Sequence, residues 1–376
     1  MQKTKLQEYF PMLKSREEVQ RIIDENDRLA RIFYSWRSKH RTEFLDFCSG
    51  ARGGKMLYDS FAKELLNPEL YPDRLGEILS ILLETEVTII DVQPNEGKRI
   101  AAENSLLTMD IVVKLKDGSI ANVEIQKIGY AFPGQRCACY SSDLLLRQYK
   151  SVRAATEDEK FSYRDIQNVY TIVFIEKSTG EFWQYPDDYQ HRFEQTSDTG
   201  LKLELLQKYI FIPLDIYLKK RENKDIGSRL DAWLVFLGSD DPEDIVRVIE
   251  TYPDFRAMYT QIYGMCQNME NMMGMFSKEL EILDRNTVKY MIDEMEDAIK
   301  QKDEIIKHQQ EQLAQQEEVI AYQGEQISQQ QGRIEEQQGQ IEQQRGQIEQ
   351  QQGQLKEQKD QILAILARLT QLEEKN

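Results

Sequence analysis

Several features that assign proteins to familiar classes are missing from this 376-residue chain. No run of 18 or more apolar residues occurs, which excludes a conventional membrane-spanning helix. The N-terminal stretch has no apolar segment of the kind that secretory signals carry, so we expect no secretion. These absences predict a cytoplasmic protein that makes no membrane contact.

Histidine and cysteine are also scarce. The chain has three histidines and four cysteines, and the cysteines show neither a CxxC pair nor the spacing of a disulfide framework. We therefore expect reduced thiols, as in the cytoplasm. A structural zinc ion needs four ligands, which these residues are too scattered to provide. Any bound metal should be held by carboxylates, which favours Mg2+ or Mn2+. The residues concerned are His40, His191, His308, Cys48, Cys137, Cys139 and Cys266.

Positive charge is in deficit as well, because 48 lysines and arginines face 65 aspartates and glutamates, a formal net charge of -17. This balance argues against a protein that coats nucleic acid passively, which would normally be basic. It does not exclude a nuclease, since such an enzyme concentrates carboxylates at its metal site and needs only a local basic groove.

Residues 1–54 are expected to form an N-terminal helical segment. Ser15 followed by Glu18 is a capping-box pattern that predicts a helix start. Residues 31–41 mix basic and aromatic side chains, a combination that can stack on nucleic acid. The simpler interpretation, an amphipathic helix with a solvated basic face, is favoured. The glycine-rich stretch at residues 49–54 marks a boundary.

Residues 55–240 alternate between helical and strand-like patterns. Two helix-like segments come first, three strand-like runs follow, and a helix and a further strand complete the order. This alternation predicts an α/β domain. A helical extension is expected over residues 241–300, where Asp241 suits the N-cap and Pro242 the first helical position.

The last part of the chain, residues 301–376, contains no proline and is dominated by glutamine, with 24 of 76 residues. An isoleucine or leucine recurs every seven residues over ten heptads, from Ile306 to Leu369. The partner core position is glutamine from Gln309 to Gln358 and becomes apolar at Ile365. We expect a long coiled-coil helix that forms a homo-oligomer through residues 301–376.

The stability of this tail should be modest. Each glycine inside a helix costs on the order of 1 kcal/mol relative to alanine, and four glycines recur at one outer heptad position. A dimer and a trimer both fit the pattern, and a mobile single helix or a partly disordered low-complexity tail is the alternative. The glycines are Gly332, Gly339, Gly346 and Gly353.

Residues 106–126 carry the pattern that suggests chemistry. Alternation places Asp110 and Lys114 on one face of a first strand, and Glu124 and Gln126 on one face of a second. Isolated carboxylates inside a sheet are costly unless they are paired or bind a metal. The simplest alternative is an ordinary hairpin with one solvated face.

The length of the turn decides whether the two carboxylates meet. A two-residue turn, Asp117-Gly118, would put Asp110 and Glu124 on opposite faces. A three-residue loop, with Gly118 in the left-handed conformation, would place them directly opposite each other, about 5 Å apart at Cβ. Like charges at that distance repel unless a divalent cation lies between them. We predict the three-residue loop and a metal held by Asp110 and Glu124.

This stretch resembles the active-site hairpin of the PD-(D/E)XK nuclease family transposases, bacterial-type nucleases also called recombination-promoting nucleases. Asp110 matches the aspartate of the motif, and Glu124-Ile125-Gln126 matches its E-x-K element in the E-x-Q form. Weaker likenesses in the same order extend the resemblance over roughly residues 55–300. They comprise Asp59, Phe61, Lys63, Arg136, Tyr140, Tyr163, Val169, Tyr170 and the runs YIFIPLDIYLKK and DAWLVFL.

The resemblance implies a restriction-endonuclease-like α/β core, a mixed sheet flanked by helices, and a metal-dependent DNA endonuclease. It implies Asp110 and Glu124 as ligands of Mg2+ or Mn2+, which would polarise the scissile phosphate and lower the pKa of an attacking water. Arg136 and Tyr140 are candidates for contact with phosphate or for an accessory role. The implied setting is recombination or mobile-element biology.

Gln126 occupies the place of the lysine that would position the attacking water. An amide carries no charge, so Gln126 can only orient that water by hydrogen bonding. Lys114, on the face of Asp110, is a candidate replacement for the missing lysine. Glu77 is a candidate extra carboxylate ligand, although a solvated helix position is the simpler interpretation.

Two other classes of function stay open. One is a nuclease-fold protein that binds DNA but is weakly active or inactive, because its motif has glutamine in place of lysine. The other is a scaffold in which the coiled coil is the functional part.

Overall fold

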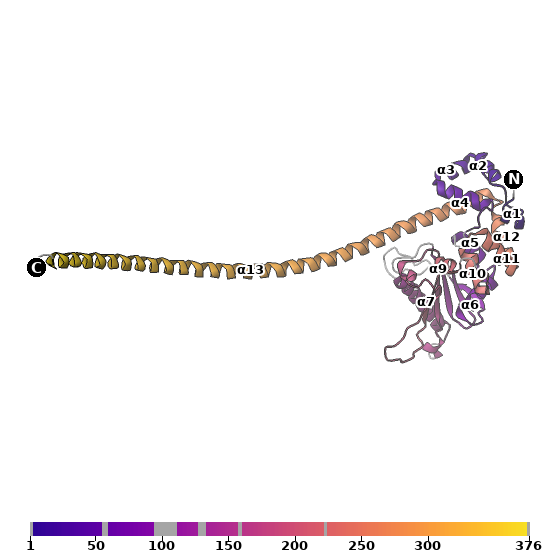
Figure 1. Cartoon of the computed structure of the whole chain (residues 1–376). Coiled ribbons are helices and arrows are strands. Elements are labelled where there is room, and N and C mark those ends of the chain that lie inside the picture. Colours follow the sequence, from indigo (N-terminus) through magenta and orange to yellow (C-terminus); the bar gives the residue numbers. More distant parts are fainter. Residues whose placement is uncertain are drawn as a thin grey trace. The chain divides into compact units, whose positions relative to one another are not determined.

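The computed structural model describes residues 3–54, 59–93, 111–126, 133–156, 160–221 and 224–373 (Figure 1). The chain divides into two units, Met1–Glu294 and Met295–Asn376. Within the ranges just given, no helix is both long and apolar enough to cross a membrane.

Four short helices open the first unit. The predicted start at Ser15 is confirmed, because its hydroxyl accepts a hydrogen bond of 3.2 Å from a backbone N–H in the first turn of α2. Two of the three aromatic residues in the basic stretch pack inward: Phe33 is buried, and the ring centroids of Trp36 and Phe276 lie 5.0 Å apart. Arg31, Arg37 and Lys39 are exposed, as the favoured interpretation of a solvated basic face expects. The stretch is not a single helix, however, because α3 ends at Ser35 and α4 begins at Ser38. The helices are α1 Lys5–Tyr9, α2 Arg16–Asp24, α3 Asp27–Ser35 and α4 Ser38–Cys48.

Six strands form one mixed sheet in the order β1-β2-β3-β4-β6-β5. The central strands β3, β4 and β6 run parallel, whereas β1, β2 and β5 join through antiparallel pairings. The predicted mixed sheet with flanking helices is therefore confirmed. The strands are β1 Ile89–Gln93, β2 Ile111–Leu115, β3 Ile120–Gln126, β4 Val169–Ile175, β5 His191–Phe193 and β6 Gln207–Pro213.

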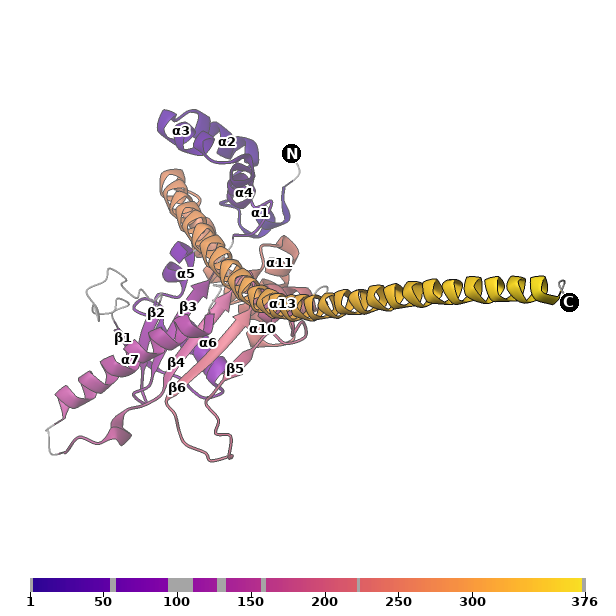
Figure 2. The same cartoon turned by 90° about the vertical axis from the view of Figure 1, so that its left-hand side faces the viewer.

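The two faces of the sheet are covered differently. On one face, Val113 and Val123 join a large apolar core with side chains of α5, α6 and α10 (Arg229–Gly238). Helix α7 lies across the other face (Figure 2), where its Tyr140 and Leu144 pack against Val112. Alternation along β3 puts Glu124 and Gln126 on this second face. The covering helices are α5 Asp59–Leu65, α6 Pro72–Leu83 and α7 Pro133–Ala155.

Helices at the C-terminal side complete the first unit. The predicted start of α11 is confirmed, because the Asp241 carboxylate accepts a backbone hydrogen bond of 2.7 Å and Pro242 occupies the first position. Trp233 on α10 and Tyr259 and Tyr263 on α12 are fully buried in the core that these two helices share with α11. The elements are α8 Gly180–Trp183, α9 Leu214–Arg221, α10 Arg229–Gly238, α11 Pro242–Thr251, α12 Phe255–Met265 and a 3-10 helix, Tyr163–Asp165.

Helix α13, Met269–Glu373, supplies the described part of the second unit. The predicted long C-terminal helix is therefore confirmed. The ten heptad positions of the Ile306–Leu369 stripe are between 50% and 70% exposed in the single chain. This helix alone leaves the apolar stripe uncovered.

Candidate active site

The hairpin that joins β2 and β3 has the predicted loop. Ile111 pairs with Val123, and the backbone N–H of Leu115 donates a hydrogen bond of 2.8 Å to the carbonyl of Ser119. Gly118 has a φ of 91°, in the region that residues with a Cβ rarely adopt. The three-residue loop is confirmed and the two-residue turn is excluded.

Asp110, the aspartate of the expected metal pair, lies outside the described residues. The loop observed is the one for which the sequence predicts Asp110 opposite Glu124. Among the residues that the structure does describe, no group of three or more histidine, cysteine, aspartate or glutamate side chains could hold a metal ion. Of the expected pair of metal ligands, Asp110 and Glu124, the structure describes Glu124.

Glu124 is buried in the interior of the sheet, with 3% of its surface exposed. Its strand continues in parallel pairing with β4, where Val173 is its partner. The Nδ2 atom of Asn122 donates a hydrogen bond of 3.0 Å to Oε1 of Glu124. Asn122 is itself fully buried, so this bond is shielded from water and orients the carboxylate. A carboxylate at this depth needs such partners or a cation, because burying a charge without compensation is costly.

Gln126, two residues further on the same face, is 4% exposed. Neither its amide oxygen nor its amide nitrogen has a hydrogen-bond partner among the described residues. The same is true of the hydroxyls of Ser141 on α7 and Thr171 on β4. Buried polar groups are nearly always hydrogen-bonded, to protein or to ordered water. The space between α7 and the sheet thus contains polar groups suited to hold water, an ion or a ligand.

Helix α7 brings Arg136 and Tyr140 to this face. The guanidinium of Arg136 lies over the Tyr140 ring, 5.0 Å from its centroid, in a cation–π contact. Tyr140 is 2% exposed and belongs to the apolar packing of α7 on the sheet. The buried Tyr140 ring therefore packs against the guanidinium of Arg136 and restricts its position. The structure places both predicted accessory residues on the side of the sheet that carries Glu124.

Cys137 lies beside Glu124 as well. Burial, and next the negative charge of Glu124, raise the pKa of the Cys137 thiol to about 12, while the positive charge of Arg136 opposes the shift. A thiol that stays protonated is a poor metal ligand. The neighbouring Cys139 is exposed, so the two cysteines do not converge on one ion.

Lys114 is not brought to this site. It pairs with Ile120, four residues along β3 from Glu124, which corresponds to about 13 Å at the usual rise per residue of a strand. There it lines a cavity of about 360 Å³ together with Asp91 and Arg147. The structure therefore gives no support to Lys114 as a replacement for the missing lysine.

Glu77 is ion-paired, and 35% of its side chain is exposed, so the expected contact with solvent is partial. The Nη2 atom of Arg229 donates a hydrogen bond of 3.0 Å to Oε2 of Glu77, and Nε1 of Trp233 donates one of 3.2 Å to the same oxygen. Glu77 lies on α6, whose apolar side chains pack on the opposite face of the sheet from α7. Its hydrogen bonds connect α6 to α10, and its carboxylate lies on the opposite side of the sheet from Glu124.

Two residues of the site were not expected from the sequence, Asn122 and Cys137. For Asn122 a signal exists, because it precedes Glu124 by two residues and so shares its strand face. For Cys137 the sequence gives no signal, since its position depends on how α7 rotates against the sheet.

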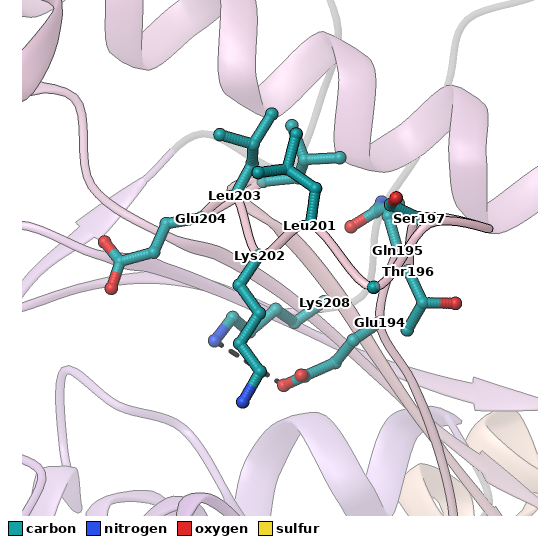
Figure 3. Close-up of a pocket in the computed structure, with 11 residues that line it drawn as sticks. Glu194, Gln195, Thr196, Ser197, Leu201, Lys202, Leu203, Glu204 and Lys208 are labelled. Atoms are coloured by element: carbon teal, nitrogen blue, oxygen red, sulfur yellow. Dashed lines mark ion pairs between the residues drawn. The ribbon is translucent and has the colours of Figure 1, made fainter.

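A separate hollow of about 630 Å³ lies at the connection from β5 to β6 (Figure 3). Lys208 and Glu194 form an ion pair of 3.5 Å there, and the exposed Leu201 and Leu203 point to one side of the loop (Figure 3). All of its lining residues except Lys208 are exposed to solvent. It therefore differs from the enclosed, polar surroundings of Glu124.

Comparison with known proteins identifies the family of the first unit. A family model described as PD-(D/E)XK nuclease family transposase matches residues 59–295. The match includes all six strands and α7, and it ends where the second unit begins. No curated protein and no solved structure matches the chain.

Proposed function

The chain belongs to the PD-(D/E)XK nuclease family transposases, and from this premise we propose that it is a metal-dependent endonuclease that hydrolyses phosphodiester bonds in DNA. Membership of the family supports a nuclease-like or transposase-related role. One observation supports the more specific assignment as a metal-dependent DNA endonuclease. Glu124 is buried beside Gln126, whose amide has no hydrogen-bond partner within the described residues. An ordinary hairpin with a solvated face would not enclose a carboxylate in this way.

The donor atoms around Glu124 fit a hard divalent cation. Carboxylate and amide oxygens are ligands that Mg2+ and Mn2+ prefer, and both kinds of oxygen occur on this strand face. We propose Asp110 and Glu124 as the ligands that hold the ion. When bound, the ion would polarise the scissile phosphate and lower the pKa of the attacking water.

The side chains of the protein divide the other tasks. Asn122 holds the carboxylate of Glu124 in a fixed orientation. Gln126 orients the attacking water through its amide, which donates and accepts hydrogen bonds but carries no charge. Arg136, supported by Tyr140, binds the scissile phosphate, because a guanidinium matches two phosphate oxygens at once.

Plasmid cleavage tests the proposal. Full-length protein with Mg2+ or Mn2+ should cut supercoiled plasmid, EDTA should stop the reaction, and Asp110→Ala should abolish it. Asp91→Asn removes an exposed carboxylate from β1 and should cut like the wild type. Absence of cleavage with either ion at high protein concentration would favour the alternative, an inactive nuclease-fold protein that binds DNA or acts as a scaffold.

We also propose that the protein works in the cytoplasm, in recombination or mobile-element biology, and that it self-associates through residues 301–376. The Ile306–Leu369 stripe supports self-association, because it is at least half exposed along its whole length. Coiled coils bury a stripe of this spacing against a second helix. Light scattering on the full-length protein should give the mass of more than one chain.

A further inference from the structure

We propose that residues 306–369 pair with the same residues of one further copy of this chain, parallel and in register. This pairing rests on the self-association proposed above, and it adds the number of chains, their direction and their register. β-Branched isoleucine at the first core position is one of the two features that favour two chains over three; the other, leucine at the second core position, is replaced here by glutamine. We therefore commit to two chains as the number to be tested by mass. The effect of this pairing on DNA cleavage, argued below, rests in addition on the proposed nuclease activity.

Two kinds of residue alternate along one face of α13 in the second unit. Isoleucine or leucine occupies a core position every seven residues from Ile306 to Leu369, and glutamine follows three residues later from Gln309 to Gln358. The apolar members are 50–70% exposed along the helix itself. A partner helix would therefore meet layers of hydrocarbon and layers of amide in turn.

The direction of the pair follows from these layers. In a parallel pair each core position meets the same position of the partner, so isoleucine faces isoleucine and glutamine faces glutamine. Two facing amides satisfy each other, because each donates and accepts. An antiparallel pair would set isoleucine against glutamine in layer after layer, and each buried amide would face hydrocarbon. The repeated glutamines therefore select the parallel pair.

The register is fixed at the C-terminal end. The repeating middle looks the same after a shift of one heptad, so it cannot choose between registers. Ile362, Ile365 and Leu369 make all core positions of this end apolar. A shift of one heptad would set Ile365 of one chain against Gln358 of the other, hydrocarbon against amide. Only the unshifted pair keeps every layer matched.

Charges beside the stripe do not oppose this alignment. In a parallel pair, each residue just before an apolar core position faces the partner residue five positions later. From Ile305 to Leu366, every such pair contains at most one charged residue. The charged members are Glu317, Arg333, Arg345 and Lys359, and each faces a glutamine. No pair of like charges destabilises the parallel, unshifted arrangement.

A parallel pair attaches both first units, residues 1–294, at the same end of the paired helices. One assembly then carries two Glu124 sites that can reach one DNA molecule. Each strand of a duplex needs its own cleavage event. We therefore expect the paired protein to cut both strands in one encounter, whereas a single chain would nick one strand at a time.

Disulfide cross-linking of single-cysteine variants tests the direction and register of the pair directly. Cys139 is the one exposed cysteine of the four, so Cys139→Ser provides the background. In it, Gln309→Cys and Gln358→Cys should each form a covalent dimer under mild oxidation. The two positions are roughly 73 Å apart along a helix, so an equimolar mixture refolded together should give no mixed dimer. Failure of both variants to link to themselves, as in an antiparallel or shifted pair, would overturn the proposal.

The mass of the full-length protein provides the second test. Light scattering should give two chains for the wild type and one chain for Ile334→Glu with Ile341→Glu, which puts charges into the core stripe. Gln329→Glu with Gln343→Glu adds the same charges at outer positions and should leave two chains. A mass of one chain or of three chains for the wild type would overturn the pair.

Cleavage assays on the same variants test the consequence for DNA. The wild type and the outer-position variant should convert supercoiled plasmid directly to linear DNA, and the core variant should accumulate nicked circles. Equal linear product from all three would overturn the two-site consequence. Absence of cleavage in every variant, with masses and cross-links as expected, would refute the nuclease proposal and leave the pairing intact.

Discussion

The Nδ2 atom of Asn122 donates a hydrogen bond of 3.0 Å to Oε1 of Glu124, and both side chains are buried on the face of the sheet that α7 covers. The bond fixes the direction of a carboxylate that has little access to water. Loss of a residue that orients a metal ligand in this way typically weakens metal binding or activity. Asn122 is therefore a positioning residue in the proposed mechanism.

Replacing Asn122 tests this role. Asn122→Ala should lower the affinity for Mg2+ by roughly 10- to 100-fold, because the Glu124 carboxylate loses its orienting donor. The measurement is cleavage rate against Mg2+ concentration, with circular dichroism to verify the fold. A variant that folds and needs no more Mg2+ than the wild type would contradict the role.

Gln126 should act on the chemical step rather than on binding. Gln126→Ala should lower kcat on the order of 100-fold, as expected for loss of a hydrogen-bonding group placed at the reacting atoms, with little change in KM. Lys114→Ala is the matched control, because the register separates Lys114 from Glu124. Equal losses in the two variants would argue against the assignment of Gln126.

Divalent cations should stabilise the folded protein through Glu124. An ion present at 100 times its Kd raises the free energy of unfolding by about 2.7 kcal/mol, which corresponds to an increase in Tm of several degrees. Thermal unfolding with and without Mg2+ should show this increase in the wild type and in Asp91→Asn, but not in Glu124→Gln. An undiminished increase in Glu124→Gln would place the ion elsewhere.

Alkaline pH should destabilise the fold through Cys137. In the unfolded chain this thiol ionises near its ordinary pKa of 9.0, but burial and the charge of Glu124 raise its pKa to about 12 in the folded protein. Its contribution to stability is therefore complete below pH 9 and is lost as the pH rises toward 12. The slope is about 1.4 kcal/mol per pH unit. Urea unfolding between pH 8 and pH 11 should show a shallower decline for Cys137→Ala, and identical slopes would contradict this origin.

Local rules were enough to predict the hairpin and the long helix. Gly118 suits the left-handed position of either turn length. The three-residue loop is predicted because it puts Asp110 and Glu124 on one face, and the observed register confirms that loop. The seven-residue period of the tail predicts its helix. The candidate site was less accessible to prediction, because it depends on which helix covers which face of the sheet. Strand alternation grouped Asn122 with Glu124, but only the packing of α7 brings Cys137 beside them.

The end of β6 shows a second limit of the sequence pattern. The apolar run at residues 209–218 suggests one continuous strand, but the strand ends at Pro213 and α9 begins at Leu214. Proline lacks the N–H that a strand ladder uses. The carboxylate of Asp215 accepts a hydrogen bond of 2.8 Å from the backbone N–H of Ser178, a contact between segments distant in sequence. Periodicity of apolar residues alone does not reveal such a contact.

Single-turnover cleavage of a labelled DNA duplex by Glu124→Gln tests the central claim most directly. The variant keeps the size of the side chain, removes its charge and replaces one oxygen acceptor by an NH2 group. We expect cleavage in Mg2+ to fall by more than about 100-fold, while Asp91→Asn cleaves at the wild-type rate and both variants unfold like the wild type without metal. Cleavage by Glu124→Gln at the wild-type rate would contradict the assignment of Glu124 as the metal-binding carboxylate.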